Sequence, residues 1–252
     1  MTAKTAPAKK PVQPKKPGPA VKRTGNQWVF PVVIATIVIV GIIAVILVAA
    51  GGGNSKSGSG GGVGAKATTE VAAEVTVTGA KLPSYAAGKA DPAIGLAAPK
   101  LGSVDFQGTN VEAGGVTGKP YAMVFLAHWC PHCQAEVPRL VSLAKAGKIA
   151  GVGVTGVATG TSKAYPNYPP SAWLDREGWP FGVMVDDARS TAADAYGLAG
   201  YPYMVFVDAQ GKVVGRTSGE VAPADVTAIF ESLAKGETPT MPGAGASSSA
   251  GK

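Results

Sequence analysis

Both cysteines and both histidines of this chain lie in one short stretch, AHWCPHCQAE, at residues 127–136. Cys130 and Cys133 are separated by two residues, with His132 between them and His128 just before them. Two such cysteines are too few for a disulfide framework, but they can form and break one disulfide. The pattern therefore indicates thiol–disulfide chemistry at a single site.

The elements around this pair decide which cysteine reacts first. The apolar run YAMVFL at residues 121–126 predicts a buried strand, and Pro131 starts a helix of about residues 131–146. Cys130 would lie at the helix N-terminus, where the helix dipole and free N–H groups stabilise a thiolate. We expect Cys130 to be the nucleophile, and Cys133 to resolve a mixed disulfide by attacking the Cys130 sulfur.

His132 points to a direction of exchange. A protonated imidazole near the Cys130 sulfur would favour the thiolate further. Stabilising the thiolate stabilises the reduced protein, which makes its disulfide a stronger oxidant. His132 therefore favours the oxidising direction.

Other uses of the motif are weaker. A static disulfide across so short a loop would stabilise the fold very little. Zinc prefers four ligands and no second cysteine pair exists, so we expect no metal site, although copper delivery stays an alternative. Covalent haem attachment requires a histidine directly after the second cysteine, where this chain has Gln134.

Residues 28–50, WVFPVVIATIVIVGIIAVILVAA, contain no charged residue. A helix of this length reaches about 34 Å, enough to cross a hydrocarbon core of about 30 Å. The run exceeds the roughly 7 to 15 apolar residues of a signal peptide, so we expect an uncleaved transmembrane helix. The small residues Val48, Ala49 and Ala50 leave a cleaved signal peptide as the alternative.

The basic residues are concentrated before this span. The formal net charge is +7, and residues 1–27 carry all of that excess with no acidic residue, so the rest of the chain is neutral. The positive-inside rule predicts a disordered cytoplasmic tail at 1–27 and an extracytoplasmic location for everything after the span. The tail could also contact anionic lipids. A neutral domain gives no basis for nucleic-acid binding.

The chain after the span is expected to fold as one domain. Residues 51–69 are rich in Gly and Ser and predict a flexible linker, residues 70–235 the folded domain, and residues 236–252 a disordered tail. Apolar runs alternate with helical patterns, which indicates an α/β fold. Strands are expected at 152–158 and 183–186, short helices at 170–178 and 190–199, a hairpin at 203–218 and a closing helix at 223–236.

Three features together resemble the thioredoxin superfamily: WCPHC after a buried strand, Pro138 five residues beyond Cys133, and the GYP sequence that ends at Pro202. The resemblance implies a central mixed sheet flanked by helices and a cis-proline facing the cysteines. Pro202 matches that proline. We therefore expect a cis Tyr201–Pro202 peptide bond, with the Tyr201 backbone aligning substrate chains beside Cys130.

A wider resemblance covers about residues 92–235. The segments AIGLAAPKL, VDFQG and WPFGVMVDD are similar to the TlpA-like branch of membrane-anchored extracytoplasmic thiol–disulfide oxidoreductases. This implies an insertion, here about residues 160–178, and a glutamate that matches Glu136, a candidate proton relay. Two departures stand out: the Pro131–His132 dipeptide is that of DsbA-type oxidants, and the buried acid of thioredoxins is replaced by Val124.

Aromatic side chains surround the motif. Trp129 is expected to form a wall of the substrate groove, and His128 is expected at its rim. The insertion carries four more aromatic residues, which predict either a small satellite core or a substrate-recognition surface. These are Tyr165, Tyr168, Trp173 and Trp179.

The sequence thus predicts a membrane-anchored extracytoplasmic enzyme that oxidises thiols of exported proteins. It would need no cofactor beyond the redox-active Cys130–Cys133 disulfide, and a membrane redox partner would reset the cysteines. One alternative is a reductant that serves cytochrome c maturation or disulfide correction. Another, of a different class, is a copper-delivery or thiol-binding protein.

Overall fold

The structure is a computed structural model that describes residues 68–242. The expected basic tail and transmembrane helix lie outside these residues, as do nearly all of the linker and the last part of the C-terminal tail. Within residues 68–242, no helix has the length and apolar character that a membrane crossing requires.

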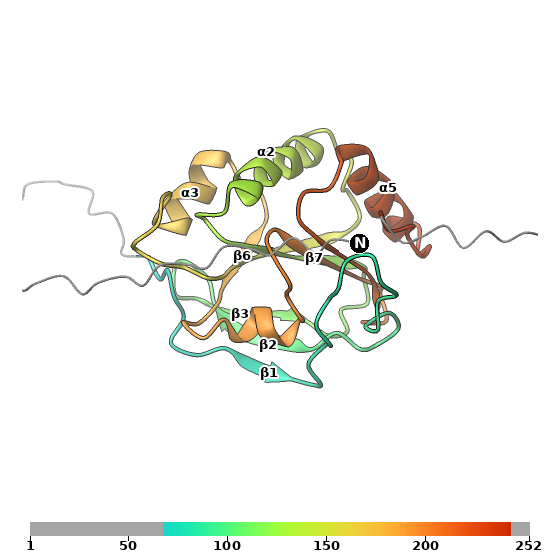
Figure 1. The fold of residues 1–252 in the computed structure, drawn as a ribbon, viewed down its shortest axis with the longest axis horizontal. Helices are drawn as coiled ribbons and strands as arrows, with labels where there is room; N and C mark the ends of the chain where they lie inside the picture. The colour runs from blue at the N-terminus through green and yellow to red at the C-terminus, as the bar shows by residue number, and fades with distance from the viewer. Residues whose placement is uncertain (1–67, 243–252) are drawn as a thin grey trace, which may run out of the picture. The chain divides into compact units, whose positions relative to one another are not determined.

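One mixed sheet of eight strands runs through the domain (Figure 1). The strands follow the order β1-β2-β6-β5-β4-β7-β8, and β3 pairs with β2. The strand β4 pairs in parallel with β5 and antiparallel with β7. The bounds are β1 (Thr76–Thr78), β2 (Lys100–Val104), β3 (Asn110–Gly114), β4 (Tyr121–Leu126), β5 (Gly153–Ala158), β6 (Gly182–Val185), β7 (Tyr203–Val207) and β8 (Val213–Ser218).

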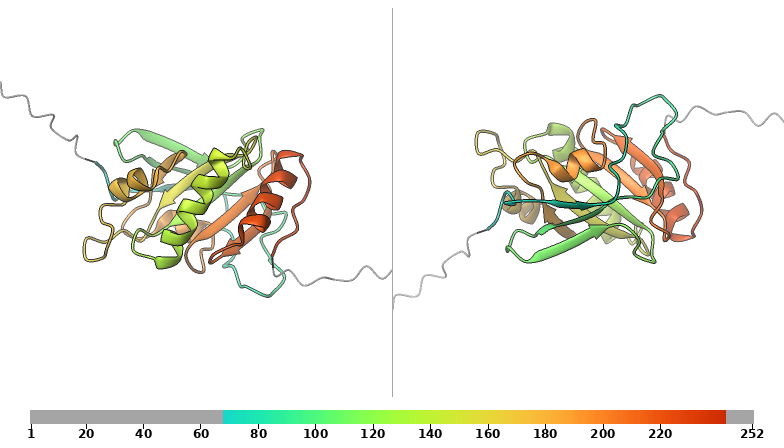
Figure 2. Two further views of the ribbon diagram at one scale, coloured as in Figure 1. Left: turned by 90° about the horizontal axis from the view of Figure 1, so that it is seen from above. Right: turned by 90° about the horizontal axis from the view of Figure 1, so that it is seen from below.

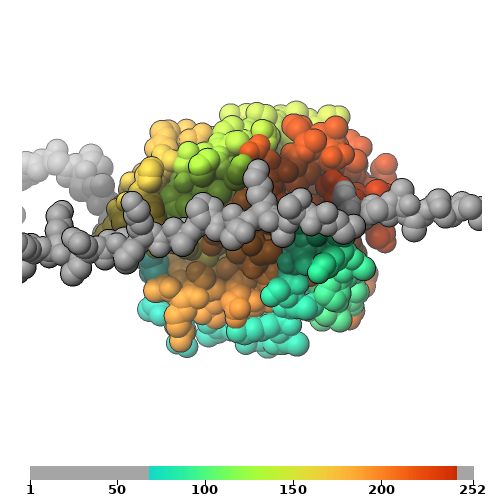
Figure 3. All heavy atoms as spheres, viewed as in Figure 1, coloured from blue at the N-terminus to red at the C-terminus, as the bar shows by residue number. Residues whose placement is uncertain are grey.

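Helices cover both faces of this sheet. Helices α2 (Pro131–Lys145), α3 (Pro170–Glu177) and α5 (Pro223–Ala234) lie on one face (Figures 1 and 2). The short α4 (Thr191–Ala195) lies on the other face, next to β1. In the space-filling view the atoms of α2 meet those of the α5 segment along the upper edge (Figure 3). The predicted α/β fold, with a mixed sheet between helices, is confirmed.

The core lies on the central strands. Every residue of β4 and of β7 is buried, because helices cover one face of these strands and the N-terminal segment and α4 cover the other. Continuous apolar runs such as YAMVFL and YMVFV are what a strand buried on both faces requires. This burial fixes the end of β4, from which the chain runs directly into the cysteine motif.

The strands β1, β2 and β3 were not predicted. They are short, with mostly half-exposed side chains, so their sequences KLGSV and NVEAG carry no clear apolar alternation. The turn of the β2–β3 hairpin is instead built by Asp105, whose Oδ1 accepts the N–H groups of Gln107 and Thr109, and by Gly108 with φ of 76°. Polar turn chemistry and strand pairing, rather than hydrophobic patterning, form this hairpin.

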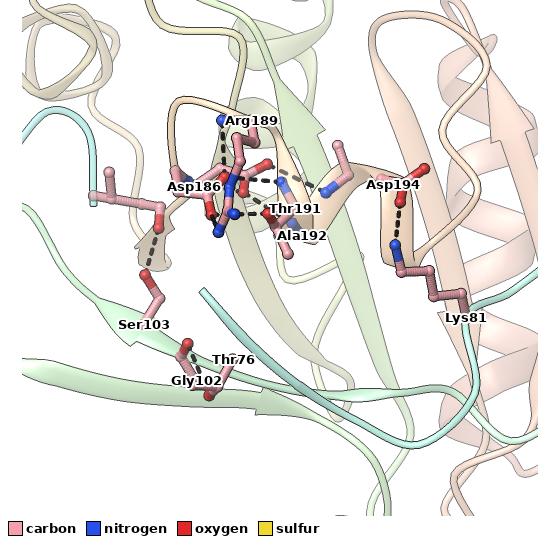
Figure 4. Close-up of polar contacts among 12 residues, drawn as sticks. Thr76, Lys81, Gly102, Ser103, Asp186, Arg189, Thr191, Ala192 and Asp194 are labelled. Carbon is pink, nitrogen blue, oxygen red and sulfur yellow. Dashed lines mark hydrogen bonds and ion pairs between the residues drawn. The ribbon is translucent and has the colours of Figure 1, made fainter. Parts of the chain in front are cut away.

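Two ion pairs fasten the N-terminal segment to the domain. Arg216 of β8 has a fully buried side chain, and its Nε donates to Asp91 Oδ2 at 2.9 Å while its second amino group reaches Asp91 Oδ1. Lys81 reaches Asp194 of α4 at the surface (Figure 4). Burial raises the pKa of Asp91, but hydrogen bonds from Arg216 and the Ala93 N–H outweigh it and hold the pKa below its ordinary value.

Candidate active site

Cys130 is the N-cap residue of α2, and Pro131 occupies the first helical position. The chain turns from β4 into the helix through a hydrogen bond from the Cys130 N–H to the Ala127 carbonyl, at 3.0 Å. Cys130 keeps 7% of its surface exposed, whereas Cys133 is fully buried. Both are free thiols. The geometry therefore gives Cys130 the access that a nucleophile needs and withholds it from Cys133.

Glu136 lies one turn beyond Cys133 and is also fully buried. Its Oε2 accepts a hydrogen bond from Arg139 at 3.2 Å, and its Oε1 has no hydrogen-bond partner among the described residues. Burial raises the pKa of Glu136, and the hydrogen bond from Arg139 only partly offsets this. Burial also raises the pKa of the Cys133 thiol well above its ordinary value, and the charges of Cys130 and Glu136 add to the increase.

His132 does not stand alone beside the cysteines. Its Nδ1 donates to Glu220 Oε1 at 2.7 Å, from the loop between β8 and α5. Arg139 donates to the other oxygen of the same carboxylate. These hydrogen bonds, the one from His132 first, lower the pKa of Glu220. Neither Glu220 nor Arg139 was predicted as part of the site, since Glu220 is 88 positions from His132 and no local pattern joins them.

The Tyr201–Pro202 peptide bond is cis, as predicted, and Pro202 is buried. The Tyr201 carbonyl lies 3.8 Å from Cys130 Sγ, within the range of a weak S–H···O hydrogen bond. A substrate chain in extended form could pair with this backbone and bring its sulfur to Cys130. The structure thus brings Tyr201 and Pro202 to the cysteines across more than 70 positions of sequence.

His128 is not a rim residue, because it is almost fully buried at 1% exposure. Its Nδ1 donates to the Pro166 carbonyl at 2.7 Å, and its Nε2 accepts the Ser162 N–H at 3.2 Å. A polar side chain must find such partners when it is buried. The expectation of a rim position is wrong: His128 holds the loop of the insertion against the site.

The aromatic residues of the insertion divide between two roles. Trp173 is buried at 1% exposure and belongs to the core, whereas Tyr165 is 53% exposed. The rings of Tyr165 and Tyr201 both pack against Trp129, with centroids 5.4 and 5.7 Å from its centroid. The Trp129 Nε1 donates to the Gly160 carbonyl at 2.8 Å, which fixes the indole next to Cys130. An aromatic surface therefore borders the nucleophile.

A hollow of about 580 Å³ is lined in part by Tyr201. Lys81, Arg189 and Asp194 line it, and Figure 4 shows these three side chains around α4. Each cation has an acidic neighbour, since Arg189 lies 3.4 Å from Asp187 and Lys81 pairs with Asp194. Among residues 68–242, no group of three His, Cys, Asp or Glu side chains gathers as a metal site would require.

Comparison with known proteins agrees with this geometry. The model of the AhpC/TSA family matches residues 94–216. Thiol-disulfide oxidoreductase ResA of Bacillus subtilis (strain 168) is 29% identical over 153 residues, which are 60% of this chain and 82% of that protein. The thiol:disulfide interchange protein DsbE homolog of Paracoccus denitrificans (strain Pd 1222) is 28% identical over 139 residues, 54% of this chain and 73% of that protein.

Among solved structures, a hypothetical protein from Sinorhizobium meliloti 1021 matches with a TM-score of 0.51 at 18% identity, over 65% of this chain and 92% of that one. This likeness concerns the fold alone. Residues 94–216 are thus similar to the AhpC/TSA family, and the fold is thioredoxin-like. With relatives that are named oxidoreductases and interchange proteins, the protein is a thiol–disulfide oxidoreductase.

Proposed function

We propose that Cys130 and Cys133 reduce disulfides in exported proteins. The Cys130 thiolate attacks one sulfur of a substrate disulfide, and the other substrate sulfur leaves as a thiolate. The Cys133 thiolate then attacks the Cys130 sulfur, so that the second substrate sulfur leaves and the enzyme holds the Cys130–Cys133 disulfide. Two electrons pass to the substrate, whose sulfurs take up protons. A membrane redox partner, as electron donor, would reset the cysteines.

One observation carries this proposal: the unequal access of the two sulfurs. Cys130 is partly exposed at a helix start beside the Tyr201 carbonyl, whereas Cys133 is fully buried in the first turn of that helix. Pro131 and Pro202 would keep the two sulfurs and the substrate backbone in place. Glu136 would accept the proton of Cys133, because it is the buried acid one turn away on the same helix.

The charges around the motif support the reducing direction. The oxidising argument depends on an uncompensated charge on His132, but Glu220 binds that imidazole, and buried Glu136 adds a second acid. Negative charge near a thiol disfavours its thiolate, which destabilises the reduced state and makes it a better electron donor. The resemblance to the TlpA-like branch also implies a reductant.

The oxidising direction remains the second candidate. It is favoured by the position of Cys130 at the N-terminus of a helix of 15 residues and by the Pro131–His132 dipeptide. Residues 28–50 are proposed to anchor the chain, with the domain on the extracytoplasmic side.

Trapping of the mixed disulfide tests the exchange itself. With Cys133→Ala, a peptide disulfide should attach covalently to Cys130 and stay attached, since nothing resolves it. With Cys130→Ala no adduct should form, because Cys133 is fully buried. Intact mass spectrometry reads both results. Equal adducts on the two variants would show that either sulfur can attack and would refute the assigned roles.

A further inference from the structure

A row of four ionisable side chains runs along one side of the cysteine motif. Three belong to α2, namely His132, Glu136 and Arg139, and the fourth, Glu220, comes from the loop between β8 and α5. Figure 3 shows the atoms of α2 in contact with those of the α5 segment, which this loop enters. The row therefore joins two elements that are distant in the sequence at the position of the reactive cysteines.

Glu220 is the member that connects the others. One of its oxygens accepts from His132 Nδ1 at 2.7 Å, and the other accepts from Arg139. Its side chain is 32% exposed, less than that of His132 at 65%. Arg139 in turn reaches the buried Glu136 at 3.2 Å. Both oxygens of Glu220 thus accept hydrogen bonds, which fixes the carboxylate in one orientation.

This arrangement determines what His132 can do for Cys130. Its Nδ1 is held by the Glu220 carboxylate, so the ring is not free to rotate toward the sulfur, and any positive charge on the ring lies next to a negative one. An ion pair presents a much smaller net charge to a neighbour than an imidazolium alone. The effect of His132 on Cys130 therefore depends on Glu220, a residue outside the CPHC motif.

We propose that Glu220 is a positioning residue that holds and neutralises His132 and thereby makes the Cys130–Cys133 pair a stronger reductant. This inference rests on the proposed exchange of disulfides at that pair. Arg139 supports the same function from the other side, because it orients the carboxylate. The imidazole is hydrogen-bonded to Glu220 from the loop. Arg139 of α2 binds the other oxygen of Glu220 and also reaches Glu136.

The test is the redox equilibrium of the full-length Glu220→Gln variant with glutathione at pH 6. Glutamine keeps the size of the side chain and removes the charge. We expect the equilibrium constant to shift about tenfold toward the reduced enzyme, which for two electrons is a potential about 30 mV more positive. Glu112→Gln, which removes an exposed acid paired with Lys100, is the matched control and should shift nothing.

A second background separates positioning from a direct field effect. In a His132→Gln chain, the further change Glu220→Gln should shift the constant less than twofold, because the group that Glu220 controls is gone. An unchanged potential in Glu220→Gln, or an equal shift in both backgrounds, would overturn the inference. If the wild-type chain itself shows no reversible dithiol–disulfide equilibrium, the proposed function fails, and that result is distinct from a failure of Glu220 alone.

Discussion

Cys133 and Glu136 are both fully buried, one turn apart on α2, so a thiol and a carboxyl group share an environment shielded from solvent. A carboxylate without full hydrogen-bond compensation is costly in an apolar environment. The chain retains it beside the sulfur that must lose a proton during each exchange. The raised pKa of Glu136 means that its ionised form costs the folded domain stability, and we propose that the same group accepts the proton of Cys133.

Glu136→Gln should make the domain more stable at neutral pH. The folded pKa of Glu136 is raised by burial, so the native state keeps a proton that the unfolded chain has lost. Stability then falls as the pH rises from the unfolded pKa, near 4.5, through the folded pKa. Each pKa unit is worth about 1.4 kcal/mol. Replacing the group should therefore raise Tm at pH 8 by a few degrees.

The comparison of pH values is the control for this prediction. At pH 4 the carboxyl is mostly protonated in both states, so most of the gain should vanish there. The measurement is Tm by circular dichroism of Glu136→Gln and wild type at pH 4 and pH 8. A gain of the same size at both pH values would point to packing instead of charge.

At the scale of elements, the N-terminal segment is held to the sheet by the buried Arg216–Asp91 pair. Arg216 also donates to the Pro83 carbonyl at 2.8 Å and to the Tyr203 hydroxyl at 3.0 Å. Its guanidinium therefore hydrogen-bonds to several segments of the chain. Removal of one partner of a buried ion pair leaves a charge without compensation. This contact couples residues before the β2–β3 hairpin to β7 and β8.

Asp91→Asn should cost roughly 3 to 5 kcal/mol of unfolding free energy, because Arg216 would remain buried and unpaired. Asp194→Asn is the matched control: it breaks the exposed pair with Lys81 and should cost about 1 kcal/mol or less. Urea denaturation of both variants measures the difference. Equal losses would contradict the view that burial decides the importance of these pairs.

The strength of the apolar pattern explains why the sequence predicted some helices and strands and missed others. The strands β4 and β7 and helix α2 have strong apolar patterns, and their bounds agree closely with those expected. The hairpin of β2 and β3 depends on pairing between polar, half-exposed segments, which leaves no periodic signal. The burial of His128 was missed for a related reason, since its partners Pro166 and Ser162 come from a loop more than 30 positions away.

For the candidate site, the local part could be predicted and the long-range part could not. The positions of Cys130 at the helix start and of Cys133 in its first turn follow from one strand, one helix start and a spacing, all of which are local. The resemblance supplied Pro202. The pairing of His132 with Glu220 depends on how the β8–α5 loop packs against α2, and no pattern within either segment reports it.

At the scale of the whole molecule, the proposed anchor decides where the enzyme meets its substrates. We predict that residues 28–50 keep the full-length chain in the membrane fraction after alkaline carbonate extraction, and that a chain lacking residues 1–50 is released. Intact mass of the mature protein is the accompanying measurement. A mature chain that begins after Ala50 would show a cleaved signal peptide and contradict the anchor.

The reduction potential of the Cys130–Cys133 pair decides between the two directions of exchange. The full-length chain is solubilised in detergent, equilibrated against redox buffers and read by acid quenching and thiol labelling. Oxidoreductases of this chemistry range from about −270 mV for reductants to about −120 mV for strong oxidants. We predict a value near −250 mV or below; a value between about −150 and −120 mV would contradict the proposal and mark the enzyme as an oxidant.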